Sequence, residues 1–231
     1  EGFACAVKTA SMTFEQLRSH VEFVGVQELL ATSAPTKIVA AIGHFGNFEL
    51  YARFSQFAPA FKTATTYRGL PQPSLNRLLQ SLRERSGCRF FERRFEGRAL
   101  RAFMKEPGAM LGLLCDQHAG DAGLRLPFFG NDCSTSSAPA VFALRYHCNL
   151  YVGICYRIGP ARWRFEAGPE IPVREHGQPR SVEAIMLDVN RAFEAAIRRD
   201  PANWFWVHNR WKAPPTDRAP AQQSAQVVAV P

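Results

Sequence analysis

Apolar residues follow two different spacings along this chain. The run Ile38–Ile42 is uncharged and β-branched at three of its five positions, which is typical of a buried strand. In Ser181–Arg199, apolar residues recur at every fourth position, which predicts an amphipathic helix that Pro201 ends. Leucines at helical spacing also follow Pro73 and Ser74, so a second amphipathic helix is expected there, with a C-cap at Gly87.

Strands and helices are therefore expected mostly to alternate. The expected strands are Ile38–Ile42, Phe61–Tyr67, Cys88–Phe91, Ala109–Cys115, Leu150–Arg157 and Arg162–Ala167, the last two forming a pair. A helix leading into a short strand is expected within Thr13–Leu30, a polar loop at Asp116–Pro127, and further helices at Gly46–Phe57, Ser74–Gly87, Gly97–Lys105, Ser137–Cys148 and Ser181–Arg199. The pattern predicts an α/β fold with a central mixed β-sheet flanked by helices on both faces.

The length of 231 residues fits one domain, which we assign to residues 1–215. Residues 216–231 are rich in Ala, Gln and Pro and lack a core-forming face, so this tail is expected to be disordered. No uncharged apolar run reaches the roughly 18–20 residues that span a bilayer. Because the chain begins at Glu1 rather than at methionine, it is interpreted as truncated at its N-terminus.

Chemistry first becomes specific in the segment KIVAAIGHFGNFEL (37–50). His44 follows the predicted strand on a glycine-containing turn, and Glu49 falls in the first turn of the next predicted helix. A carboxylate on one imidazole nitrogen fixes the tautomer and leaves the other nitrogen free to take a proton from a hydroxyl. The alternative is a core histidine followed by a glutamate that the helix dipole favours.

A second polar residue occupies the equivalent place on another strand. Asp116 comes directly after the apolar segment Ala109–Cys115, as His44 comes after Ile38–Ile42. Ligands of open α/β sheets bind where the carboxyl ends of the strands meet. The sequence therefore predicts that His44 and Asp116 converge on one crevice.

The positive charge of the chain is concentrated in residues 62–105. This segment holds eleven Lys or Arg against three Glu, an excess of +8 that equals the net charge of the whole chain. The candidate anionic partners are nucleic acid, a phospholipid surface, a phosphorylated glycolipid and an acidic carrier protein; the alternative is a solvated helix face.

The six cysteines show neither CxxC pairs nor zinc-ligand spacing, so we expect free thiols in a reducing compartment and no metal site. A GxSxG nucleophile elbow is also missing from the sequence, which argues against a serine hydrolase.

Four ordered blocks resemble the lipid A biosynthesis (late, secondary) acyltransferases of Gram-negative bacteria, within the lysophospholipid-acyltransferase-like superfamily. They are GHFGNFEL, similar to the HxxxxD/E motif; Tyr67-Arg68 with the helix Leu75–Gly87; Gly108–Gly130 with its Asp-Gln turn and Phe-Phe-Gly; and Pro201–Lys212. Together they cover roughly residues 20–213.

The resemblance implies an O-acyltransferase without cofactor or metal. The donor would be a fatty acyl thioester of acyl carrier protein or coenzyme A, and the acceptor a hydroxyl of a lipid A precursor or related anionic glycolipid. The implied partners are acyl carrier protein and the membrane surface, with no nucleic acid. The implied location is the cytoplasmic face of the bacterial inner membrane, reached peripherally or through an N-terminal anchor that would precede this chain.

The resemblance also suggests roles for single residues: His44 as general base and Glu49 as the acid that orients it. Substrate-binding candidates are Arg68, Arg83, Arg85, Asp116 and Gln117; guanidinium groups suit phosphate or an oxyanion. Asp116 could equally order or cap its loop. Arg210 and Trp211 are candidates for contact with membrane or phosphate, the alternative being a packed C-terminal segment with Trp204 and Trp206 in the core.

Two other functions stay open. One is acyl transfer to a different lipid acceptor, namely a lysophospholipid, an aminolipid or a phosphoinositide mannoside. The other is a basic membrane- or nucleic-acid-binding module without catalysis. Such a module needs a basic surface with exposed aromatic residues but no His–Glu pair at a strand end, so the motif at 44–49 favours an enzyme.

Overall fold

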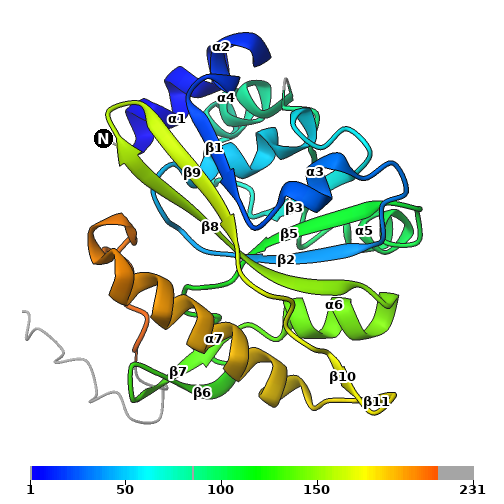
Figure 1. Cartoon of the computed structure of the whole chain (residues 1–231). Coiled ribbons are helices and arrows are strands. Elements are labelled where there is room, and N and C mark those ends of the chain that lie inside the picture. Colours follow the sequence, from blue (N-terminus) through cyan, green and yellow to red (C-terminus); the bar gives the residue numbers. More distant parts are fainter. Residues whose placement is uncertain (1, 85, 213–231) are drawn as a thin grey trace, which may run out of the picture.

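The structure is a computed structural model, and it describes residues 2–84 and 86–212. Its centre is a seven-stranded sheet of order β1-β9-β8-β2-β5-β3-β4 (Figure 1). The strands are β1 (Val21–Val24), β2 (Ile38–Ile42), β3 (Lys62–Tyr67), β4 (Arg89–Glu92), β5 (Ala109–Leu114), β8 (Asn149–Gly159) and β9 (Arg162–Ala167). Two small hairpins lie outside this sheet: β6 (Leu124–Phe128) with β7 (Asn131–Thr135), and β10 (Arg174–Glu175) with β11 (Gln178–Pro179).

The helices are α1 (Gly2–Ser11), α2 (Phe14–Arg18), α3 (Gln27–Ala31), α4 (Pro73–Glu84), α5 (Gly97–Phe103), α6 (Ala138–Tyr146), α7 (Val182–Arg199) and the 3₁₀ helices η1 (Phe48–Gln56) and η2 (Pro201–Asn203). Strands β8, β2, β5, β3 and β4 are mutually parallel, whereas β9 is antiparallel to β8. The predicted α/β fold with a mixed sheet is therefore confirmed.

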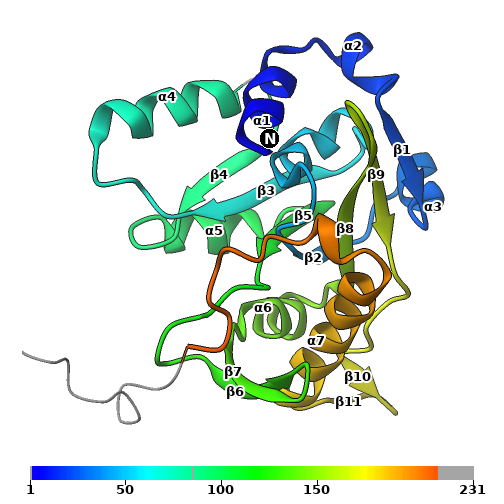
Figure 2. The same cartoon turned by 90° about the vertical axis from the view of Figure 1, so that its left-hand side faces the viewer.

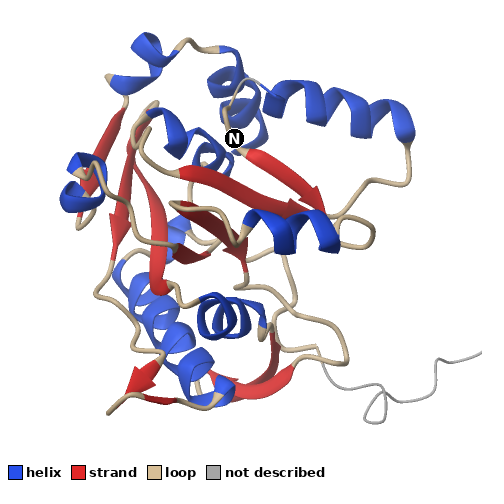
Figure 3. Cartoon of the chain, turned by 90° about the vertical axis from the view of Figure 1, so that its right-hand side faces the viewer, coloured by secondary structure: helices blue, strands red, loops and turns tan. Residues whose placement is uncertain are grey.

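Helices cover both faces of this sheet, as its alternating side chains require (Figures 1 and 3). Val39 and Ala41 of β2 face the core that includes α5, α6 and α7. Ile38, on the other face of the same strand, packs in a cluster with Phe54 of η1 and Leu29 of α3. Burial on both faces explains why the sequence of β2 is a continuous apolar run rather than an alternating one.

The predicted strands and helices of the sheet layers lie close to their observed positions, but two local predictions differ. Segment 48–56 is a 3₁₀ helix rather than a full helix from Gly46. The region predicted as a polar loop, Asp116–Pro127, already contains β6. β6 and β7 turn at Phe129 and Gly130, both with positive φ, as two-residue hairpins require. Phenylalanine is an uncommon residue at such a position, so the turn carried no clear signal.

Residues 216–231, predicted to be a disordered tail, lie outside the described residues. None of the described helices is both long and apolar enough to cross a lipid bilayer.

Candidate active site

His44 and Asp116 meet where two adjacent parallel strands end. Strand β2 pairs with β5 so that Ile42 lies opposite Leu114, and the backbone N–H of Cys115 donates to the carbonyl of Ile42 at 3.1 Å. The residues that follow Ile42 and Leu114 along the chain are therefore brought close to each other. The predicted convergence of His44 and Asp116 at one edge of the sheet is confirmed.

Asp116 holds both the backbone and the imidazole of His44. Its Oδ1 accepts from Nδ1–H of His44 at 2.7 Å, and its Oδ2 accepts from the backbone N–H of His44 at 2.7 Å. The indole N–H of Trp204 donates to the same Oδ2 at 2.8 Å. Complete burial of Asp116 opposes its ionisation, but the hydrogen bonds from His44 and Trp204 and the attraction of the imidazole outweigh burial and keep its pKa below the ordinary value.

This arrangement defines the tautomer of His44. An ionised carboxylate can only accept, so Nδ1 of His44 carries a proton; in the neutral imidazole, Nε2 then presents the lone pair. The ring of Phe48 lies edge-on to the imidazole at 4.7 Å, and the Phe205 ring lies 6.3 Å away. The imidazole is thereby held between aromatic rings with Nε2 available to accept a proton.

The C-terminal segment 203–205 holds the other side of the His44 turn. The N–H of Phe205 donates to the carbonyl of His44 at 3.0 Å, and the N–H of Gly46 donates to the carbonyl of Asn203 at 2.9 Å. Between them, Phe45 and Trp204 form an antiparallel bridge. The expectation that Trp204 lies in the core is confirmed, whereas Trp206 is about half exposed, 51%, and that expectation was wrong.

Glu49 lies in the first turn of the next helix, as predicted, but its partner is not the predicted imidazole. Its carboxylate accepts from Arg83 of α4 at 3.0 Å, and no hydrogen bond within the described residues joins it to His44. Glu49 is the second residue of η1, and Asp116 already occupies Nδ1 of the imidazole. The acid that orients His44 in this structure is therefore Asp116 rather than Glu49.

The Glu49–Arg83 ion pair gives a testable coupling. We expect Glu49→Gln and Arg83→Gln each to lower the activity of this site, and the double variant to be no worse than the poorer single variant. The reason is that either single change breaks the same ion pair. A double-mutant cycle on the reaction rates measures this coupling; residues in direct contact typically couple by about 0.5–3 kcal/mol. Strictly additive losses would show that the two side chains act separately.

Arg210 is fully buried, so its predicted contact with membrane or phosphate was wrong. Its guanidinium donates to the carbonyls of Gln117 and Ser134 and to the Thr135 hydroxyl. Trp211 is partly buried and its indole N–H donates to the Phe128 carbonyl at 2.9 Å. Both residues fasten the C-terminal segment to the β6–β7 hairpin and to the loop after Asp116.

The remaining predicted residues are spread over the same edge of the sheet. Arg83 lines the cleft beside His44, while Arg68 is exposed after β3. The side chain of Gln117 is partly exposed, and its described hydrogen bond is made by its backbone carbonyl. Arg85 lies outside the described residues.

Two neighbouring histidines link the C-terminal segment to the Asp116 loop. Nε2 of His208 accepts from the backbone N–H of His118 at 3.0 Å. Burial, followed by repulsion from His118 and His44, lowers the pKa of His208 below 6.5. A proton on Nε2 would also remove the acceptor that His118 needs.

This lowered pKa predicts how stability depends on pH. A histidine whose folded pKa lies below its unfolded value contributes full stability above the unfolded pKa, and that contribution is lost as pH falls below it. We expect the melting temperature to fall between about pH 7.5 and about pH 5.5. His208→Gln keeps an acceptor but does not titrate, so the melting temperature of this variant should fall less over the same pH range. Part of the fall should remain, because burial also lowers the pKa of His118. Equal falls in both proteins would contradict this.

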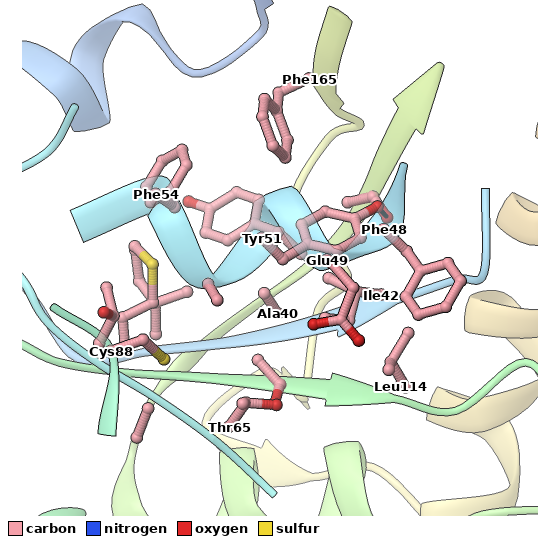
Figure 4. A pocket seen from close by; sticks show the side chains of 18 of the residues that line it. Ala40, Ile42, Phe48, Glu49, Tyr51, Phe54, Thr65, Cys88, Leu114 and Phe165 are labelled. Atoms are coloured by element: carbon pink, nitrogen blue, oxygen red, sulfur yellow. Dashed lines mark hydrogen bonds between the residues drawn. The ribbon is translucent and has the colours of Figure 1, made fainter. Parts of the chain in front are cut away.

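His44 opens onto a cleft of about 760 Å³ between η1, α1 and the segment 202–205. Phe48, Glu49, Ala52 and Arg83 line this cleft and also a second, apolar cavity of about 130 Å³. That cavity lies between η1 and the sheet. Figure 4 shows Phe48 and Glu49 toward one end and Phe54 and Cys88 toward the other, with Ala40 on the strand below.

The floor of this cavity is open because small residues lie side by side on neighbouring strands. Ala40 of β2 is paired with Gly112 of β5, and Ile42 with Gly153 of β8. A Cβ at Gly153 would lie 3.3 Å from Ile42 and 3.8 Å from Tyr51. The site thus combines an imidazole held by a carboxylate, an open cleft, and an apolar cavity that shares lining residues with this cleft.

A sequence model of one family matches almost all of this chain. The model describes the bacterial lipid A biosynthesis acyltransferases, and the match spans residues 3–213. The chain belongs to this family. The match covers β2, β5 and the C-terminal segment, which together hold His44 and Asp116 in place. No curated protein matches the chain at a significant level.

Proposed function

We propose that this member of the lipid A acyltransferase family moves a fatty acyl chain from a thioester of acyl carrier protein, or of coenzyme A, to a hydroxyl of a lipid A precursor or related glycolipid. The observation that carries the proposal is the His44–Asp116 pair at the cleft, because Asp116 engages Nδ1 and leaves Nε2 of the neutral imidazole to act as the base. The adjacent apolar cavity gives the fatty chain a place to lie.

In this proposal Nε2 of His44 takes the proton of the acceptor hydroxyl as its oxygen attacks the thioester carbonyl. The tetrahedral intermediate then collapses, the C–S bond breaks, and the imidazolium returns the proton to the departing thiolate. Asp116 stabilises the transient imidazolium and prevents the ring from turning. No acyl-enzyme forms, so the chemistry requires both substrates in the cleft together.

Arg83 is one of the arginines that line this cleft. Its guanidinium lies at the cleft, paired with Glu49 and close to the face of Phe90 at 5.1 Å. We assign it to an anionic group of the substrates, either the developing oxyanion or a phosphate. Glu49 then acts by holding Arg83 in place.

The apolar cavity predicts an effect of side-chain size on donor choice. Ala40→Leu places a larger side chain on the cavity floor, and the expected result is a loss of transfer with long acyl chains but not with short ones. Excluding one methylene group of a substrate from an apolar pocket typically lowers its relative reaction rate by about tenfold or more. The measurement is the ratio of rates for long and short donors in one variant, so the short donor is the internal control. An unchanged ratio would place the chain elsewhere.

The basic segment 62–105 suits the proposed substrates and partners, since acyl carrier proteins are acidic and lipid A precursors carry phosphates. We place the enzyme at the cytoplasmic face of the bacterial inner membrane, where such an acceptor resides. No metal or further cofactor is needed for the proposed reaction.

The test is an assay of the wild-type protein with acyl carrier protein or coenzyme A carrying defined chains and a panel of lipid acceptors, read by mass spectrometry. Appearance of an ester on a lipid A precursor supports the proposal. Esters formed only on a lysophospholipid, an aminolipid or a phosphoinositide mannoside would move the function to that acceptor. Failure with every donor would favour a non-catalytic membrane-binding module.

A further inference from the structure

Two exposed loops project at the edge of the sheet where His44 and Asp116 lie. One is the segment 68–70 after β3, and the other is the segment 93–95 after β4. Both strands run parallel to β5, so their carboxyl ends face the same side as the cleft. Figure 2 shows the two loops side by side, between α4 and α5.

Glu92 joins the two loops into one surface. Its Oε1 accepts from the N–H of Gly69 at 3.2 Å, while its Oε2 accepts from the N–H groups of Arg94 and Phe95 at 2.6 and 3.1 Å. In addition, the N–H of Arg93 donates to the carbonyl of Tyr67 at 3.1 Å. The backbone of both loops is therefore fixed independently of the side chains that they present to solvent.

The side chains on these loops combine positive charge with apolar groups. Arg68, Arg93 and Arg94 are exposed and form no ion pair with another described residue. Phe95 is 84% exposed and Leu70 is 38% exposed. We call these five residues the arginine–phenylalanine surface.

Two carboxylates also lie on these loops, and both accept hydrogen bonds from backbone N–H groups. Glu92 is engaged by three backbone N–H groups, and the Oε2 of Glu96 accepts from the backbone N–H of Glu92 at 2.6 Å. The three exposed arginines outnumber these two carboxylates, so the surface keeps a net positive charge. An exposed phenylalanine ring among arginines suits a surface that offers anionic groups at one depth and hydrocarbon just below it.

We propose that the arginine–phenylalanine surface docks on an anionic phospholipid bilayer, with its arginines at the lipid phosphates and Phe95 inserted between headgroups. The proposal rests on the proposed function, because a lipid acceptor must reach His44 from the bilayer. Docking by this edge brings the cleft to the membrane. An acidic carrier protein complements the arginines equally well but gives no reason for a ring as exposed as Phe95.

The test measures binding of the purified chain to vesicles of phosphatidylcholine with and without phosphatidylglycerol, by co-sedimentation and without any substrate. Arg93→Glu/Arg94→Glu should lower binding to the anionic vesicles by about tenfold or more. Phe95→Ser should lower it as well while leaving all charges in place. The matched control is Arg18→Glu/Arg191→Glu, two exposed arginines on α2 and α7, which should retain binding.

Unchanged binding of both loop variants would overturn the proposal. So would variants that retain vesicle binding but lose binding to acyl carrier protein, since the surface would then be a carrier site. Because the side chains substituted on the two loops make no described ion pair, the melting temperatures of the loop variants should match the wild type. Transfer to a detergent-dispersed acceptor is measured separately, because it tests the proposed function without a bilayer. A protein that binds vesicles but does not transfer would contradict the proposed function and leave the docking surface standing.

Discussion

Replacing His44 with Ala is expected to lower the rate of acyl transfer by about 10²–10⁴-fold, the usual contribution of a positioned general base. Without the imidazole, the attacking hydroxyl must lose its proton to water. The loss should fall on the chemical step rather than on donor binding, because the cleft and the apolar cavity are lined mainly by other residues. Single-turnover rates with a saturating acyl donor measure it.

Two further measurements make this result specific to the base. Added imidazole should restore part of the activity of His44→Ala, because the truncated side chain leaves room between Phe48 and Phe205. The matched control is His176→Asn on the exposed turn between β10 and β11, where asparagine tolerates the positive φ of 50°. Full transfer activity in His44→Ala would mean that the chemistry lies elsewhere.

The sequence predicted the parts of this site that depend on strand ends. Apolar runs identified β2 and β5 as buried strands, and the position of His44 and Asp116 directly after them predicted a shared crevice. This inference holds because parallel neighbours in one sheet bring their carboxyl ends to one edge. It required no knowledge of any particular side-chain contact.

The choice of the carboxylate beside the imidazole could not be made from the sequence. Glu49 lies five positions from His44, whereas Asp116 lies 72 positions away, so local spacing pointed to Glu49. Two facts decide otherwise. The direct pairing of β2 with β5 places Asp116 against Nδ1, and Arg83 of α4 holds the Glu49 carboxylate. Both depend on long-range packing that local spacing does not encode.

The C-terminal segment was the part most open to a second interpretation. Tryptophan and arginine close together suit either a membrane interface or a packed segment, and side-chain type alone does not separate the two. Trp204 could have been favoured as the partner of a buried carboxylate, since a buried indole N–H usually finds an acceptor. For Arg210, complete burial among carbonyls follows from the β6–β7 hairpin, which the sequence did not reveal.

Asp116→Asn is expected to lower the transfer rate by about 10³–10⁴-fold, even though it changes one atom of a residue that does not touch the substrate. The amide has one acceptor oxygen and an NH₂ group in place of two acceptors. Since Asp116 receives N–H groups from His44 and Trp204 on both oxygens, one of them must then face a donor. If the NH₂ faces Nδ1, the imidazole proton shifts to Nε2 and the base is lost.

Graded variants separate this tautomer effect from a loss of folding. Trp204→Phe removes one hydrogen bond to Asp116 but keeps the carboxylate on His44, so its loss of rate should be clearly smaller than that of Asp116→Asn. Asp132→Asn, an exposed aspartate on β7, serves as the control for the chemical change itself. Melting temperatures of all three variants are measured alongside the rates. If Asp116→Asn remains folded and transfers at the wild-type rate, the His44 imidazole does not depend on this carboxylate.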